Sequence, residues 1–83
     1  MSRFRIQYAD QAEASRQAMT PALRTAFEQA MTKTLGTDPY GHGSAAIKKD
    51  NDYREATIGG VFVVYYVSPA PDVLVVTALR LLY

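Results

Sequence analysis

The stretch VLVVTALRLLY, residues 73–83, decides the fold of this 83-residue chain. It is rich in valine and leucine and holds no glycine or proline, so it predicts a β-strand. Successive strand residues point to opposite faces, and both faces of this stretch are mostly apolar. We therefore expect a central strand covered on both sides. Arg80 falls on the face of Val76 and Ala78, where its guanidinium must reach solvent, a carboxylate or a ligand anion.

Two more strands precede this one. Residues 53–58 and 61–67 are separated by Gly59-Gly60, a pair typical of a two-residue hairpin turn. Residues 68–72, SPAPD, are turn-forming and lead to the last strand. Connections this short predict an antiparallel meander.

The segment before the meander is irregular. Residues 37–44, TDPYGHGS, have turn-forming composition throughout. Residues 45–49 could begin a strand, and residues 50–52, DND, indicate a turn.

The N-terminal half predicts one strand and two helices. Residues 4–8 alternate between apolar and polar side chains, as a short strand does. Asp10 is the expected N-cap of a first helix over residues 11–19. Thr20-Pro21 begins a second helix, which Gly36 ends. The order β-α-α-β-β-β predicts a single α+β domain, residues 1–83, with a helical hairpin packed on an antiparallel sheet.

Composition excludes several classes of site. The chain has no cysteine and one histidine, which rules out a disulfide framework, a thiol nucleophile and a cysteine zinc site. We expect neither a metal nor another cofactor. No segment resembles a signal peptide, and the longest apolar run, residues 61–67, is too short to cross a bilayer, so we expect a cytoplasmic protein without membrane contact. The net charge of +1 lacks the basic excess of most nucleic-acid binders.

Four kinds of side chain could carry chemistry. Lys48 and Lys49 are either a solvated pair or phosphate contacts. Arg54 is either in a surface ion pair or a phosphate ligand. His42, between two glycines, is either a tolerated loop residue or a proton shuttle. Tyr83 could stack on a base or donate a proton.

The order of these motifs resembles the RelE/ParE superfamily of toxins from type II toxin–antitoxin systems. The resemblance rests on FRIQY at residues 4–8, Asp38-Pro39, Tyr53-Arg54, Gly59-Gly60 and the ending at residues 75–83. It covers nearly the whole chain. The loop at residues 39–43, PYGHG, is most similar to the YoeB-like branch.

The resemblance implies a microbial ribonuclease-like fold and metal-independent cleavage of mRNA in the ribosomal A site. It implies that the 2′-hydroxyl attacks the adjacent phosphate and that Arg80 stabilises this phosphate, assisted by Arg54. Tyr83 would orient or stack on the substrate, and Glu55 is a candidate general base that no motif match places. Lys48, Lys49 and His42 are the candidate RNA-binding residues. A cognate antitoxin would bind across the active face, and the ribosome would be the second partner.

Two departures from the family pattern leave other functions open. Phe62 stands where the family carries a phosphate-binding arginine, and Leu82 stands where the YoeB-like branch carries a catalytic histidine. One alternative is a non-catalytic member of the fold, either a ParE-like gyrase inhibitor or a protein-binding module. Another is a domain of a different family that forms a homodimer through an exposed sheet edge.

Overall fold

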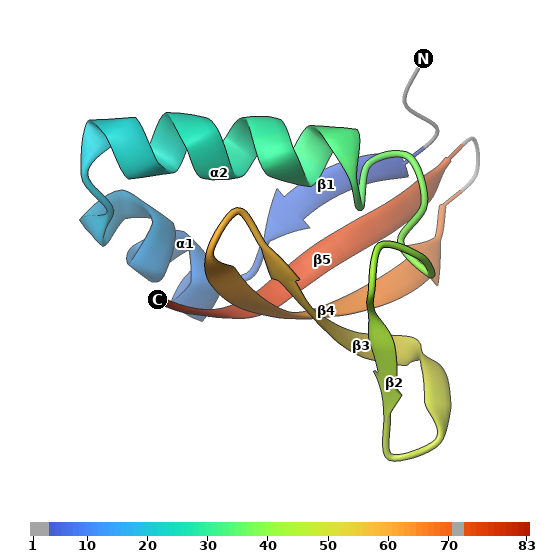
Figure 1. The fold of residues 1–83 in the computed structure, drawn as a ribbon. Helices are drawn as coiled ribbons and strands as arrows, with labels where there is room; N and C mark the ends of the chain where they lie inside the picture. Colours follow the sequence, from blue (N-terminus) through green and yellow to red (C-terminus); the bar gives the residue numbers. More distant parts are fainter. Residues whose placement is uncertain (1–3, 71–72) are drawn as a thin grey trace.

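The computed structural model describes residues 4–70 and 73–83 of the chain, and it contains two helices and five strands (Figure 1). The predicted α+β class and its element order are confirmed. A short strand precedes the meander, within residues 45–49, where the sequence allowed a strand to begin. The elements are β1 (Phe4–Tyr8), α1 (Asp10–Ala18), α2 (Pro21–Lys33), β2 (Ala45–Ile47), β3 (Asp50–Ile58), β4 (Val61–Pro69) and β5 (Leu74–Leu82).

The strands form one sheet in the order β1-β5-β4-β3-β2. The pairs from β2 to β5 are antiparallel, as predicted, whereas β1 joins β5 in parallel and makes the sheet mixed. Parallel pairing requires a long crossover, and the helices and the meander together supply it. With β1 on one side and β4 on the other, β5 is an interior strand, which confirms its predicted central place. Pro71 and Asp72 of the expected turn lie outside the described residues.

Both helices pack on the same face of the sheet (Figure 1). At the start of α2 the Thr20 hydroxyl accepts a hydrogen bond from the Leu23 amide at 3.2 Å, with Pro21 in the first turn, as expected. At the start of α1 the expected cap is wrong by one position, because Ala9 is the N-cap and Asp10 is helical. The core contains Ala12, Met19, Phe27, Met31, Leu35, Ala56, Ile58, Val61, Val63, Tyr65, Val67, Val76, Ala78 and Leu81.

Arg16 links the two helices on their polar side. Its guanidinium donates to both carboxylate oxygens of Glu13, at 2.9 and 2.6 Å, and reaches Glu28 of α2 at 3.3 Å. It also lies over the ring of Tyr8, 5.2 Å from the centroid. The hydrogen bonds to Arg16 lower the pKa of Glu13 to about 2.

The chain leaves α2 in a tight turn that needs glycine. The helix ends at Lys33 with Thr34 as its C-cap, one residue earlier than a C′ position at Gly36 implies, and the Gly36 amide donates to the Met31 carbonyl at 2.9 Å. A Cβ atom at Gly36 would lie 2.5 Å from the carbonyl oxygen of Thr32. Backbone packed this closely excludes any side chain at Gly36.

The β2–β3 hairpin turns at Lys48-Lys49, which corrects the predicted turn at residues 50–52. Ile47 pairs with Asp50, so the two lysines are the whole turn, with φ of 53° and 65°. The left-handed region disfavours side chains with a Cβ, and such turns usually carry asparagine and glycine. Because two lysines are unusual in such a turn, the sequence did not indicate it. The hairpin projects from the body of the sheet (Figure 1).

Candidate functional site

The sheet face turned away from the helices, here called the open face, carries the candidate site. Its members follow from the strand register and from the alternation with core residues on each strand. Within the described residues no helix covers this face, so the expectation that β5 is covered on both sides is wrong. The open face comprises Arg5 and Gln7 of β1, Tyr53, Glu55 and Thr57 of β3, Phe62, Val64, Tyr66 and Ser68 of β4, and Val75, Thr77, Arg80 and Leu82 of β5.

A β-bulge directs Arg80 to the open face. Val64 pairs with Arg80 but the next residue, Tyr65, pairs with Ala78, so Leu79 has no partner in the register. A bulge inserts one residue and reverses the alternation beyond it. Strict alternation had predicted that Arg80 shares a face with Val76 and Ala78, which are buried against the helices. The bulge corrects this prediction, and Arg80 is exposed.

Glu55 and Arg80 occupy one transverse row of the open face. Glu55 pairs with Val64 on β4, and Val64 pairs with Arg80 on β5. At the usual strand spacing their Cα atoms lie about 10 Å apart. A carboxylate and a guanidinium on either side of a small apolar residue leave room for a phosphodiester between them. In this row Glu55 can accept a proton and Arg80 can bind an anion, and each is held on a strand of the sheet.

The next row toward the end of β5 is apolar. Phe62 pairs with Leu82, and Leu82 is half exposed, at 51%. These residues are the two departures from the family pattern. They are therefore cross-strand neighbours, and an apolar pair stands at the two positions where the pattern carries polar side chains.

Arg54 does not belong to this site. It pairs with Tyr65 on the helix-facing side of the sheet and is 6% exposed. Its guanidinium donates to the Ser44 hydroxyl at 2.9 and 3.2 Å, to Asn51 Oδ1 at 2.9 Å and to the Tyr40 carbonyl at 3.2 Å. Neither the surface ion pair nor the phosphate contact considered from the sequence is compatible with a buried, fully hydrogen-bonded side chain. The structure therefore gives Arg54 a buried structural role and does not bring it together with Glu55 and Arg80.

That role is to hold the loop between α2 and β2. Arg54 lies over the ring of Tyr40, 5.4 Å from the centroid, and the Tyr40 phenol donates to Asp52 at 2.7 Å. Burial and this hydrogen bond raise the pKa of Tyr40 to about 12. Below the loop the phenol of Tyr65 donates to the Pro39 carbonyl. The loop, whose composition is turn-forming throughout, is thus fixed at three points.

Tyr83 is tied to the first helix. Its phenol donates to the Ser15 carbonyl at 2.8 Å, although the side chain is 59% exposed. This hydrogen bond directs the ring away from the open face, so the structure does not bring Tyr83 together with Glu55 and Arg80. An edge of the ring remains open to solvent.

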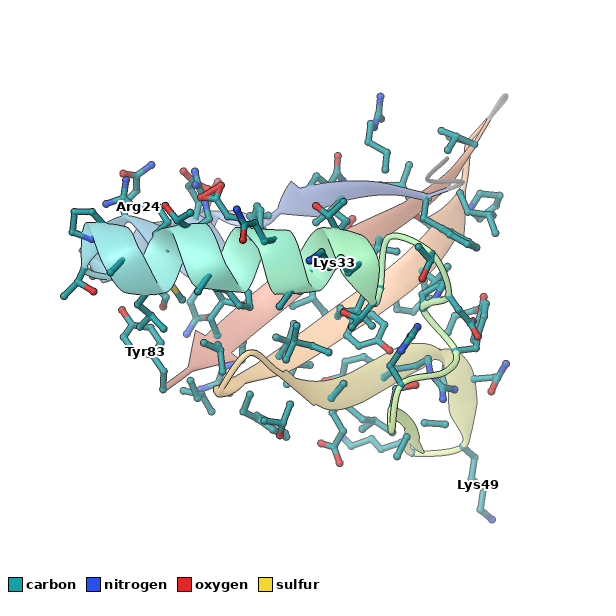
Figure 2. All side chains as sticks on the ribbon, turned by 45° about the horizontal axis from the view of Figure 1, so that its top comes forward. Arg24, Lys33, Lys49 and Tyr83 are labelled. Carbon is teal, nitrogen blue, oxygen red and sulfur yellow. The ribbon has the colours of Figure 1, made fainter. Side chains whose placement is uncertain are left out.

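The three candidate RNA-binding residues lie on two loops. Lys48 and Lys49 are exposed at the tip of the β2–β3 hairpin, and Figure 2 draws Lys49 at the opposite end of the molecule from Tyr83. His42 is exposed, with φ of 58°, and its Nε2 lies 3.5 Å from the Thr37 hydroxyl. The structure therefore brings none of the three into the Glu55–Arg80 row.

Neither a metal cluster nor a membrane span is found in the described part of the chain. Residues 4–70 and 73–83 contain no group of three or more His, Cys, Asp or Glu side chains arranged to hold a metal ion. Across the same ranges, no helix has the length and apolarity to cross a bilayer.

Sequence reasoning missed the aromatic part of the open face. Tyr53 and Tyr66 pair across β3 and β4, and the row continues through Thr77 to Gln7. The signal for Tyr53 was present, because it stands two positions before Glu55 on the same strand and must share its face. The signal for the pairing was the Gly59-Gly60 turn, which fixes the register of the hairpin.

Comparison with solved structures supports the fold. No protein-family model matches the sequence, and no curated protein matches it. Among solved structures, a chain of the archaeal RelE-RelB complex from Pyrococcus horikoshii OT3 matches with a TM-score of 0.68 and 18% sequence identity. The match covers 95% of this chain and 92% of that chain. It confirms the fold that the resemblance implied.

Proposed function

We propose that this chain is the toxin of a type II toxin–antitoxin pair and that it cleaves mRNA on the ribosome. The observation that carries the proposal is the row of Glu55 and Arg80 on an uncovered sheet face. The sequence resemblance over nearly the whole chain and the shared fold with a chain of a RelE-RelB complex support it.

The proposed reaction is transesterification by the RNA's own 2′-hydroxyl. Glu55 accepts the proton of the 2′-hydroxyl as its oxygen attacks the adjacent phosphorus. Arg80 stabilises the negative charge that builds on the phosphate oxygens, a contribution that depends on preorganised donors. The bond to the 5′-oxygen then breaks, and that oxygen takes a proton from water. The products are a 2′,3′-cyclic phosphate and a free 5′-hydroxyl.

The row lacks two groups that would speed this reaction. Phe62 supplies no second cation, and Leu82 supplies no acid for the leaving oxygen. Each preorganised donor is worth on the order of 10²–10³ in rate. We therefore expect slow cleavage compared with a toxin that carries both groups.

The test is to incubate the protein with programmed ribosomes and to map the mRNA ends. We expect new ends in the A-site codon with the wild-type chain and none with Arg80→Ala. Lys33→Ala is the matched control, since it removes a cation from α2, on the helix side of the sheet (Figure 2). Absence of A-site ends with the wild type, in the presence of an active reference toxin, would reject ribonuclease activity.

We propose a cognate antitoxin as the protein partner. The solved structure with the shared fold is a complex of RelE with RelB. Co-expression with the product of any small reading frame found next to its gene should restore growth of cells that the chain alone inhibits. Continued inhibition, with both proteins detected by blotting, would count against this partner.

The apolar pair Phe62–Leu82 favours one alternative, a non-catalytic member of the fold. In that case the chain would inhibit gyrase as ParE-like proteins do, or would serve only as a protein-binding module. A supercoiling assay separates these functions. Inhibition of gyrase without mRNA cleavage would replace the ribonuclease proposal, and unchanged supercoiling would reject the ParE-like one.

A further inference from the structure

The row of Tyr53, Tyr66, Thr77 and Gln7 combines two aromatic rings with two hydrogen-bonding groups. It crosses four adjacent strands, from β3 to β1, next to the row that holds Glu55 and Arg80. Tyr66 is 39% exposed, the most exposed aromatic ring on the open face. Tyr53 is partly exposed beside it, and a pair of aromatic rings accessible on an uncovered sheet face is suited to stack against a flat ligand.

The polar end of the row is preorganised. The Gln7 amide nitrogen donates to the Thr77 hydroxyl at 2.9 Å, which fixes the orientation of both side chains. The exposed Gln7 side chain keeps its amide oxygen as an acceptor. An amide and a hydroxyl of this kind are suited to the edge of a nucleobase, whereas the tyrosine rings are suited to its face.

The charges beside the row favour a nucleotide over an apolar protein segment. Arg80 lies in the row on one side, and Arg5, paired with Val75, lies in the row on the other. Both arginines are exposed. Rows on one face are about 7 Å apart, since two strand residues separate them. Two cations that flank an aromatic row match single-stranded RNA, in which phosphates and bases alternate along the chain.

We propose that Tyr53 and Tyr66 form a stacking platform for a nucleobase of single-stranded RNA. Thr77 and Gln7 contact the edge of this base, and Arg80 and Arg5 bind the phosphates on either side of it. The proposal rests on the proposed function for the identity of its ligand. It adds a subsite next to the row that would carry the reaction. This subsite determines which nucleotide is preferred beside the cleaved bond.

The experiment uses a short single-stranded RNA with one 2-aminopurine, titrated with the full chain at low salt and in the absence of ribosomes. Stacking on tyrosine quenches 2-aminopurine, so quenching that saturates reports the platform directly. The titration covers the 10⁻⁶–10⁻⁴ M range typical of non-specific nucleic-acid binding. Tyr66→Leu should weaken binding by about 5- to 150-fold and reduce the quenching.

Two further variants separate stacking from folding. Tyr66→Phe keeps the ring and should retain binding and quenching. Thr57→Leu places the same leucine on the same face of β3 outside the row, and it should bind as the wild type does. Equal binding by Tyr66→Leu and the wild type, or no quenching across the range, would overturn the platform.

The outcomes distinguish this proposal from the proposed function. A-site cleavage without quenching rejects the platform and leaves the ribonuclease in place. Quenching that depends on Tyr66 but no cleavage rejects the ribonuclease and leaves an RNA-binding face. If light scattering instead shows a wild-type dimer that Tyr66→Leu converts to a monomer, and no RNA binds, the face is an interface between two copies and the platform is overturned.

Discussion

Phe62 and Leu82 face each other across β4 and β5, one row beyond Arg80 on the same open face. An apolar pair therefore occupies both positions at which the RelE/ParE pattern carries polar groups. If the chain has kept the geometry of an RNA-cleaving site, restoring those groups should restore rate. If the chain serves only to bind, the same change should have no such effect.

The first prediction concerns this pair. Phe62→Arg should raise the rate of A-site cleavage by on the order of 10²–10³, because it adds a preorganised cation beside Arg80. Adding Leu82→His should raise the rate further by supplying an acid for the leaving oxygen. The rates are measured from the appearance of 3′ ends on programmed ribosomes. The matched control is Thr57→Arg, which adds the same charge to β3 at the edge of this row. An equal gain from Thr57→Arg would show that charge alone, and not position, raises the rate.

The second prediction concerns Arg54. Arg54→Met should lower the free energy of unfolding by about 3–5 kcal/mol, because it leaves the buried acceptors of the α2–β2 loop unpaired. A domain this small has little stability to lose, so Ser44→Ala provides a milder test with an expected loss of about 1 kcal/mol. Both losses are measured as shifts of the urea midpoint at constant m-value. An Arg54→Lys variant with unchanged stability but no cleavage would instead return Arg54 to the reaction.

The third prediction concerns the Lys48-Lys49 turn. Replacing the two lysines by Asn-Gly should stabilise the chain by about 1–2 kcal/mol, because it removes side chains that disfavour the left-handed region. For a domain of this size, each kcal/mol corresponds to about 4–8 °C in melting temperature. If the lysines also contact RNA, the slope of log affinity against log salt should fall by about 0.7 for each lost phosphate contact. If the Asn-Gly variant is no more stable than the wild type, the backbone at the two lysines is not strained.

The fourth prediction concerns alkaline pH. Burial raises the pKa of Tyr8 to about 12, and burial together with Asp52 raises the pKa of Tyr40 to about 12. Both values exceed the ordinary value of 10. The folded chain therefore binds more protons than the unfolded chain between pH 10 and pH 12, so stability should fall as pH rises through this window.

Unfolding by urea at a series of alkaline pH values measures this loss, and Tyr8→Phe should reduce it. Phenylalanine keeps the contact with Phe27, whose ring centroid lies 6.4 Å from that of Tyr8, and removes the titrating group. A variant that loses as much stability as the wild type over the same window would contradict the assignment to Tyr8.

The sequence was sufficient to predict the fold wherever local pattern and global structure agree. Thr20-Pro21 and Gly59-Gly60 each specify a backbone geometry that few other residue pairs favour, and both lie where predicted. The Lys48-Lys49 turn was missed for the opposite reason, because its residues oppose the geometry they adopt. The parallel pairing of β1 with β5 could not be predicted either, since it joins residues that lie about 70 positions apart in the sequence.

The candidate site was predicted in part. Glu55 and Arg80 were identified as separate residues, but only the bulge at Leu79 brings them to one face. A bulge depends on packing on both sides of the strand and leaves little trace in a single sequence. Arg54 shows the converse. Its charge suggested a ligand, whereas its partners Ser44, Asn51 and Tyr40 could be identified only from the fold.

The pairing of β1 with β5 has a consequence for synthesis. Residues 4–8 leave the ribosome about 70 residues before their partners at residues 74–78 are made. The interior strand β5 is thus missing from any nascent chain that has not reached residue 74, and contacts between distant residues form slowly. Until β5 emerges, neither the Glu55–Arg80 row nor the tyrosine row beside it exists.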